Sequence, residues 1–210
     1  MDHPANLIFK HFPDLCEQAR ARFLKLESLY REWNAQINVV SRQDIDNLYL
    51  HHVLHSLGIA KIVPFPPGSS ILDVGTGGGF PGIPLAILHP DCTFKLIDSM
   101  AKKVLVTKAV AEALELQNVA VEQRQIAEER GKFTFVVSRG VMSLPRLAKL
   151  VKKNLSPKSR NSLSGSLVCL KGGDLTQELA PFGTLVKVYE LSAYFPYPFF
   201  ETKKVVCLPG

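Results

Sequence analysis

Hydrophobic residues in the first third of the chain recur at helical spacing. From Ala19 to Ile37 they follow one another at steps of four and three, which places them on one face of a helix. After a break near Asn38, a second helical stretch carries Leu48 and Leu57 on its apolar side. We therefore predict that the chain begins with a helical extension.

From residue 70 the pattern changes to short β-branched runs that alternate with helical segments. The predicted strands are Ile71–Val74, Phe94–Ile97, Val119–Glu122, Phe133–Val137 and Leu167–Leu170, and the predicted helices are Gly82–Leu88, Lys102–Leu116 and Leu144–Asn154. Apolar strands that alternate with helices predict an α/β fold with a parallel sheet covered on both faces. The strand-like segments Leu185–Leu191 and Lys203–Leu208 have no helix between them, which predicts an antiparallel pair at one edge of the sheet.

A turn-rich segment, PFPPGSS, separates the two patterns near residue 64. We therefore expect a helical extension over residues 1–63 and a ligand-binding domain over residues 64–210. Within the second part, the polar segment SPKSRNSLSGS over residues 156–166 is expected to be a mobile loop.

Composition is typical of a globular protein, with 210 residues of which 46% are hydrophobic and 21% charged. No apolar run approaches the roughly 18 residues that a membrane helix needs. The first residues lack the basic patch and apolar core of a secretory signal, so we expect a cytoplasmic protein without membrane partners. The four cysteines are far apart in sequence, which argues against a metal site.

Positive charge gathers in the second half of the chain. Between Arg146 and Arg160 there are six cations and no acidic residue. This asymmetry favours a polyanionic partner such as nucleic acid. A solvated helix face explains the charge equally well at this stage.

Five of the fourteen glycines fall within eight residues directly after the first predicted strand. The first turn between strand and helix is the usual ligand cradle of such a sheet, and glycine lets a ligand approach the backbone. Gly77, Gly79 and Gly82 match the dinucleotide fingerprint, which leaves a nicotinamide oxidoreductase as an alternative. The carboxylate of Asp73 would repel a pyrophosphate there, and Pro81 removes an N–H donor.

S-adenosylmethionine suits this loop better, because it has no phosphate and carries two cationic groups that a carboxylate attracts. The order of Asp73, Gly75, Gly77 and Gly79 supports this ligand. Asp98, at the end of the second predicted strand, could accept hydrogen bonds from both ribose hydroxyls. Its alternative role is the N-cap of the following helix.

The segment VVSRGV after the fourth predicted strand contains no acid and no histidine that could act as a general base. An acceptor with a free lone pair, such as guanine N7, needs no base, so catalysis would consist mainly of positioning. Arg139 would hold the cofactor or an RNA phosphate, or else be a surface or ion-paired arginine. Lys171, in LKGG, could contact phosphate.

With these motifs in hand, the chain resembles the glucose-inhibited division protein B family, the bacterial guanine-N7 methyltransferases of small-subunit ribosomal RNA. The resemblance rests on LYREWNAQINVVSRQD, HHVLHSLGIAK, ILDVGTGGGFPGIPLAI, KLIDSMAKKV, FVVSRGVMSL and LKGG. It implies a class I S-adenosylmethionine-dependent methyltransferase fold, with seven mostly parallel strands and an antiparallel last strand. The implied acceptor is guanine 527 in the 530 loop of 16S ribosomal RNA, free or in the small-subunit particle.

The expected site combines the motif residues with those that the resemblance implies. The cofactor-binding residues are expected to be Asp73, Gly75, Gly77, Gly79, Phe80, Asp98, Ser99, Ile126, Ala127 and Arg139. The RNA-binding residues are expected to be Arg146, Lys149, Lys152, Lys153 and Lys171. Arg139 is also expected to be the catalytic positioning residue.

Three departures from the family pattern bear on this site. Gln125, Ile126 and Ala127 stand where the family has R-A-E, so either Ala127 or Glu128 takes the adenine-side contact. Gly140 replaces the alanine of S-R-A, and His55 replaces an acid.

Besides the methyltransferase and the nicotinamide oxidoreductase, a third functional alternative is an RNA-binding protein with a relic pocket and no activity.

Overall fold

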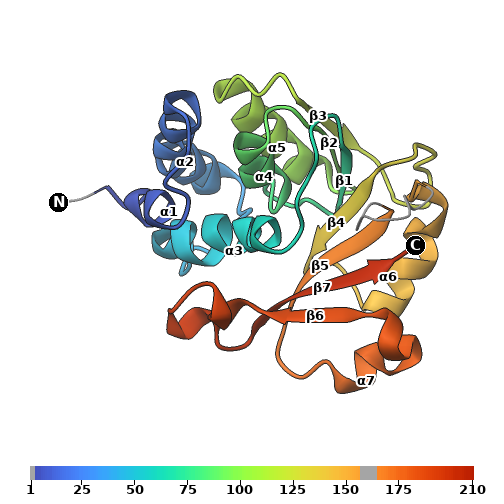
Figure 1. The fold of residues 1–210 in the computed structure, drawn as a ribbon. Coiled ribbons are helices and arrows are strands. Elements are labelled where there is room, and N and C mark those ends of the chain that lie inside the picture. Colours follow the sequence, from blue (N-terminus) through green and yellow to red (C-terminus); the bar gives the residue numbers. More distant parts are fainter. Residues whose placement is uncertain (1–2, 157–164) are drawn as a thin grey trace.

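A computed structural model describes residues 3–156 and 165–210 of the chain. Its centre is a seven-stranded sheet with the strand order β3-β2-β1-β4-β5-β7-β6 (Figure 1). The strands are β1 (Ser70–Val74), β2 (Thr93–Asp98), β3 (Val119–Gln123), β4 (Phe135–Arg139), β5 (Ser166–Gly172), β6 (Lys187–Glu190) and β7 (Lys203–Pro209). The first five strands pair in parallel, and β7 runs antiparallel to both β5 and β6. The mostly parallel sheet and its antiparallel last strand are therefore confirmed.

Helices cover both faces of the sheet. The helices of the second region are α4 (Gly82–Leu88), α5 (Ala101–Ala113), α6 (Leu144–Val151) and α7 (Thr176–Leu179). Alternate strand residues point to opposite sides, so that Ile71 joins the core under α4 and α5, while Leu72 joins the core under α6. Because both faces are covered, successive residues of β1 and β4 are buried, which explains why these strands could be found as short apolar runs.

Several element boundaries differ from the prediction by one to three residues; for example, the helix predicted to reach Asn154 ends at Val151 and is followed by a 3₁₀ turn. β4 begins at Phe135, because Phe133 forms only an isolated bridge with Leu155. The helix predicted to reach Leu116 ends at Ala113, and Glu115 then adopts a positive φ of 52°. Most of the loop predicted over residues 156–166 lies outside the described residues.

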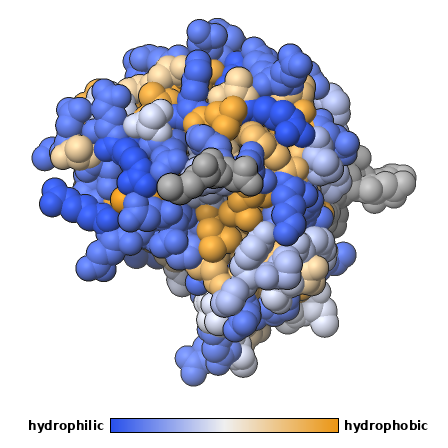
Figure 2. Space-filling model, turned by 90° about the vertical axis from the view of Figure 1, so that its left-hand side faces the viewer, coloured by the Kyte–Doolittle hydropathy of each residue, from blue (hydrophilic) through white to orange (hydrophobic). Residues whose placement is uncertain are grey.

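The N-terminal region consists of α1 (Asn6–His11), α2 (Glu17–Gln36), a π-helical segment (Leu48–Leu54) and α3 (His55–Leu57). Leu48 and Leu57 are both fully buried, as expected of an apolar helix face. The helix between them is wider than an α-helix, a geometry that is common at functional sites. Figure 2 shows that the outer face of this region is mostly hydrophilic, with a band of exposed apolar side chains.

The N-terminal helices and the sheet share one hydrophobic core. Phe23 and Leu26 of α2 belong to the same buried cluster as Phe94 of β2 and Phe135 of β4. Among the residues that the structure describes, no helix is long and apolar enough to cross a membrane, and no group of three or more acidic, histidine or cysteine side chains is arranged for a metal. Cys16 is exposed and the other three cysteines are buried.

Candidate functional site: a cavity at the carboxyl ends of the parallel strands

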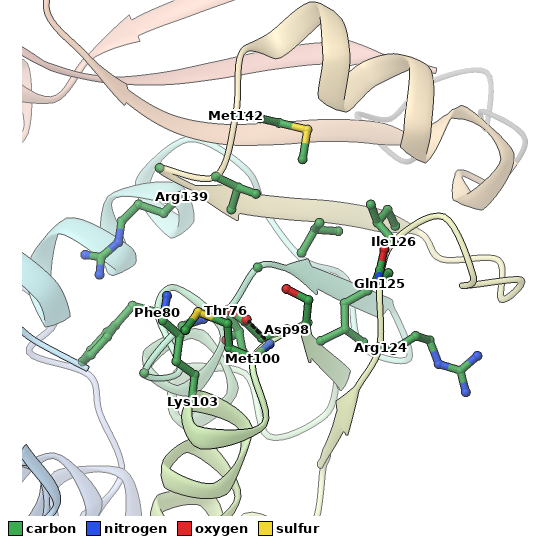
Figure 3. A pocket seen from close by; sticks show the side chains of 18 of the residues that line it. Thr76, Phe80, Asp98, Met100, Lys103, Arg124, Gln125, Ile126, Arg139 and Met142 are labelled. Atoms are coloured by element: carbon green, nitrogen blue, oxygen red, sulfur yellow. Dashed lines mark hydrogen bonds between the residues drawn. The ribbon is translucent and has the colours of Figure 1, made fainter. Parts of the chain in front are cut away.

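A cavity of about 690 Å³ lies where β1, β2 and β4 end (Figure 3). The strand order reverses between β1 and β4, and such a switch point is where open α/β sheets bind ligands. Its walls come from the loops that follow these strands and from the start of α6. The described lining residues are Val39, Val74, Gly75, Thr76, Gly77, Gly78, Phe80, Ile97, Asp98, Ser99, Met100, Lys103, Arg124, Gln125, Ile126, Ala127, Arg139, Gly140, Val141, Met142, Arg146 and Leu150.

The glycine loop forms the wall after β1. Gly75 and Gly77 have positive φ angles of 67° and 60°, a conformation that side chains other than glycine rarely adopt. A Cβ on Gly75 would also overlap Cγ2 of Val141. The loop therefore presents its backbone to the cavity with no side chain in the way at these positions.

Asp73 differs from our expectation, because it lies beneath the glycine loop and does not line the cavity. Its side chain is fully buried, and its Oδ2 accepts hydrogen bonds from the Thr76 hydroxyl at 2.7 Å and the Gly82 N–H at 2.9 Å. Burial raises the pKa of Asp73 to about 7. Asp73 therefore holds the glycine loop to the start of α4 from below. Gly79 is likewise absent from the lining.

Asp98 lies on the opposite side of the cavity from Arg139 (Figure 3). Its Oδ2 accepts from the Gly77 N–H at 3.0 Å and its Oδ1 from the Met100 N–H at 2.9 Å. Each carboxylate oxygen keeps a second lone pair, so Asp98 could still accept a pair of hydroxyl groups. The alternative N-cap role is wrong, because Met100 occupies that position of α5.

The loop after β3 forms the next wall, where Ile126 and Ala127 line the cavity together with Gln125. Glu128 is exposed and does not line it; its carboxylate accepts only from the Gln125 N–H, at 3.4 Å. Of the two candidates for an adenine-side contact, Ala127 lines the cavity and Glu128 does not. The Ala127 carbonyl is fixed by Lys153, whose Nζ donates to it at 2.5 Å.

Arg139, at the end of β4, lines the cavity but directs its guanidinium toward the N-terminal helices (Figure 3). Its Nη2 lies 3.1 Å from Nδ1 of His52, and its Nη1 donates to the His51 carbonyl at 3.3 Å. The guanidinium lies 5.1 Å from the ring centre of Phe80, within cation–π range. Burial lowers the pKa of Arg139 to about 10, so it remains charged at neutral pH.

Three residues of α2 and the following turn support the cavity, and the sequence indicated only packing for them. Tyr30 donates from its hydroxyl to the Gly78 carbonyl at 2.6 Å and stacks on Phe80 at 4.9 Å between ring centres. Asn34 accepts from the Val39 N–H at 2.9 Å and so holds Val39 in the cavity wall. All three residues lie within LYREWNAQINVVSRQD, one of the segments that carry the family resemblance, but the segment does not show these contacts.

The expected RNA-binding residues divide into two groups. Arg146, Lys149 and Lys152 are exposed along α6 and the turn that follows it, and Arg146 reaches the cavity. Lys153 is half-buried against Ala127. Lys171 is only 12% exposed, and its Nζ donates to Glu178 at 2.7 Å and to the Met142 carbonyl at 2.8 Å. Lys171 therefore lies in an internal ion pair, whereas we expected a lysine that is available to phosphate.

The sheet, its antiparallel last strand and the glycine-lined cavity define the fold of class I S-adenosylmethionine-dependent methyltransferases. An O-methyltransferase from Thermotoga maritima matches with a TM-score of 0.59 and 15% identity, over 79% of this chain and 69% of that one. The ribosomal protein L11 methylase from Lactobacillus delbrueckii subsp. bulgaricus matches with a TM-score of 0.55 and 16% identity, over 74% and 76%. These similarities concern the fold alone.

Residues 20–203 match the GidB family, described as rRNA small subunit methyltransferase G, and the chain belongs to this family. A ribosomal RNA small subunit methyltransferase G from Bacteroides thetaiotaomicron is 55% identical over 95% of this chain and 97% of its own length. The protein of the same name from Flavobacterium psychrophilum is 54% identical over 96% of both chains. The family resemblance seen in the sequence is thereby confirmed.

Proposed function

We propose that this chain transfers the methyl group of S-adenosylmethionine to N7 of a guanine in 16S ribosomal RNA, guanine 527 by family resemblance. The observation that carries the proposal is the combination of family membership with a cavity that joins the glycine loop to Asp98. A nicotinamide oxidoreductase is a poorer fit. The Gly82 N–H at the start of α4, which could bind a pyrophosphate, already donates to the buried carboxylate of Asp73.

The residues present fit the cofactor. The backbone of Gly75 to Gly78 would lie along its aminoacyl chain, and Asp98 would accept hydrogen bonds from its ribose hydroxyls. Ile126 and Ala127 would flank its adenine, with Ser99 beside the ribose. When bound, the cofactor supplies an electrophilic methyl group on a sulfonium.

The cavity walls contain no evident general base. Asp98 is the only carboxylate among the described lining residues, and two backbone N–H groups already bond to it. Guanine N7 needs no base, because it attacks through a lone pair that carries no proton. The chain would therefore act by excluding water and holding the base in line with the methyl group. Arg139 and Phe80 stand at the β4 side of the cavity, where they would position the reacting groups.

The decisive experiment is methyl transfer to purified 16S ribosomal RNA and to small-subunit particles, followed by mass spectrometry of the nucleosides. We expect 7-methylguanosine, and its absence from both substrates would contradict the proposal. Calorimetric titration with S-adenosylhomocysteine and with NADH separates the two cofactor classes, since binding of NADH alone would favour an oxidoreductase. RNA binding without methyl transfer would favour a protein with a relic pocket.

We propose that the exposed cations of α6 and of the turn after it bind the RNA backbone beside the cavity. Each phosphate that they neutralise contributes a slope of about 0.7 to the dependence of log affinity on log salt for a single strand. We expect Lys149→Ala and Lys152→Ala each to reduce the slope by about this amount. Lys108→Ala is the matched control, since Lys108 is an exposed cation on α5 that does not line the cavity. If the three substitutions reduced the slope equally, the proposed RNA-binding surface on α6 would be wrong.

A further inference from the structure

A chain of hydrogen bonds connects Asp44, outside the cavity, to Arg139, in its wall. Oδ1 of Asp44 lies 2.5 Å from Nδ1 of His51, and Oδ2 lies 2.7 Å from Nε2 of His52. The other ring nitrogen of His52, Nδ1, lies 3.1 Å from Nη2 of Arg139. His52 thus stands between a carboxylate and a guanidinium.

This arrangement fixes the tautomer of His52. A guanidinium only donates hydrogen bonds, so Nδ1 of His52 must accept from Arg139. Burial would raise the pKa of Asp44, but its contacts with His51 and His52 outweigh this effect and lower the pKa. Ionised Asp44 only accepts, so Nε2 of His52 carries the proton and donates it.

The groups that face His52, apart from Asp44, favour this neutral form. Burial, followed by the charge of Arg139, lowers the pKa of His52 to about 4, against the opposing effect of Asp44. The ring of Phe80 covers one side at 5.4 Å between ring centres, and His51 adds a further lowering effect. His52 is therefore an uncharged acceptor for Arg139 at neutral pH.

Arg139 depends on this acceptor. Among the described residues, no carboxylate lies within 4.0 Å of its guanidinium nitrogens, so the contact with Asp44 through His52 replaces a direct ion pair. Its other hydrogen bond is to the His51 carbonyl, on the same π-helical segment. The π-helical turn thus directs one ring and one backbone carbonyl toward the same guanidinium.

We propose that His52, oriented by Asp44, is a positioning residue that fixes the Arg139 guanidinium over Phe80 and so sets the shape of the β4 side of the cavity. The effect on methyl transfer rests on the proposed function, whereas the hydrogen-bond chain itself does not. The contact between His52 and Arg139 lies on the β4 side of the cavity, whereas Asp98 lies at the end of β2. The loss of His52 should therefore lower kcat more than it lowers the affinity for cofactor.

Two substitutions of His52 separate its two ring nitrogens. In His52→Asn the amide oxygen stands near the place of Nδ1 and retains an acceptor for Arg139. In His52→Gln the longer amide stands near Nε2 and retains the bond to Asp44 but leaves Arg139 without its acceptor. We expect kcat to fall about tenfold or more in His52→Gln and to stay within about threefold in His52→Asn. Binding of S-adenosylhomocysteine should change by less than about threefold in both.

The matched controls are His89→Asn and His89→Gln, since His89 is a mostly enclosed histidine after α4 whose Nε2 has no partner and which does not line the cavity. Neither should change kcat. Equal kcat values for His52→Asn and His52→Gln would overturn the proposal, because a role in packing alone does not distinguish the two nitrogens.

A second measurement does not depend on activity. The ¹⁵N chemical shifts of the His52 ring in the cofactor-free protein should show a protonated Nε2 and an unprotonated Nδ1 at pH 7, and Asp44→Asn should disturb this state. A protonated Nδ1 would overturn the proposal. If this tautomer is found but the unmodified protein methylates no ribosomal RNA, the proposed function fails while the contact stands.

Discussion

The wall of the cavity beside β2 and β3 is assembled within the sheet, whereas the wall beside β4 depends on a helix 87 residues earlier in the chain. On the first side, Asp98 is the last residue of β2, and Ala127 lies in the loop that follows β3. On the second, Arg139 and Phe80 are held by His52 and Tyr30. The residues that line the cavity thus lie close to the strands in sequence, whereas His52 and Tyr30, which hold two of them in place, come from the N-terminal helices.

The largest effect should come from the wall beside β2. Asp98→Ala removes the acceptor for the ribose hydroxyls and also frees the N–H groups of Gly77 and Met100. Hydrogen bonds to a charged group contribute about 1.5–3 kcal/mol each, so we expect affinity for S-adenosylhomocysteine to fall about 100-fold or more. Isothermal titration calorimetry measures this loss.

RNA binding serves as the control for Asp98→Ala, because the exposed cations lie on α6 and do not contact Asp98. RNA affinity should stay within about twofold of that of the unmodified protein. If Asp98→Ala bound S-adenosylhomocysteine with unchanged affinity, the wall beside β2 would not be the one that holds the cofactor.

A smaller effect should come from the link between α2 and the glycine loop. Tyr30→Phe leaves the Gly78 carbonyl without its buried partner, which costs about 1–3 kcal/mol of unfolding free energy. The matched variant is Tyr49→Phe, since the Tyr49 hydroxyl donates to the Phe23 carbonyl at 2.7 Å and does not touch the loop. Urea unfolding should show similar losses for both.

Cofactor binding separates these two tyrosines. We expect Tyr30→Phe to weaken S-adenosylhomocysteine binding about fivefold, through the displaced loop, and Tyr49→Phe to leave it unchanged. If both variants lost affinity equally, the N-terminal helices would support the cavity only through general stability.

The smallest effect should be the dependence of stability on pH. Burial lowers the pKa values of His52 and His89 from 6.5 to about 4, so the unfolded chain binds more protons between these values, and stability is lost as the pH falls. Burial raises the pKa of Asp73 from 3.8 to about 7, so its contribution is lost as the pH rises. His55, whose pKa burial lowers well below 6.5, adds to this loss. The three histidines together outweigh the aspartate, so the unfolding free energy should decrease as the pH falls from 7 to 5.5.

Asp73→Asn sharpens this measurement by removing the opposing group. The loss between pH 7 and pH 5.5 should then be larger by about 1–2 kcal/mol, because the opposing carboxyl no longer titrates. An unchanged profile in Asp73→Asn would mean that the carboxylate is already ionised throughout this range. Denaturant titrations at several pH values provide the comparison.

The sheet was largely predictable, because its strands are buried apolar runs and the glycine loop marks the first of them. All seven strands fall within or beside predicted segments, although β4 starts two residues later, at Phe135. The π-helical turn was not predictable, because Leu48 and Leu57 fit an ordinary helix face as well. The segment packs against α1 and α3, and the pattern of hydrophobic positions does not contain these contacts.

The cavity was predictable where residues follow strand ends in sequence. Asp98, Ser99, Ile126 and Ala127 all line it. Asp73 and Lys171 are placed differently from our expectation, because the sequence does not show whether a charged side chain turns inward to a Thr76 hydroxyl or to Glu178. Long-range partners such as Tyr30 and Asn34 could not be found, since their contacts depend on how the helices pack.

The turn held by Asn34 also limits how the chain can be divided. Val39 closes one wall of the cavity, and Phe80 stacks on Tyr30, so residues 64–210 transplanted alone into another protein would carry the glycine loop without its cover. The two regions therefore form a single unit for engineering or for evolutionary recombination, even though a proline-rich joint separates them along the chain.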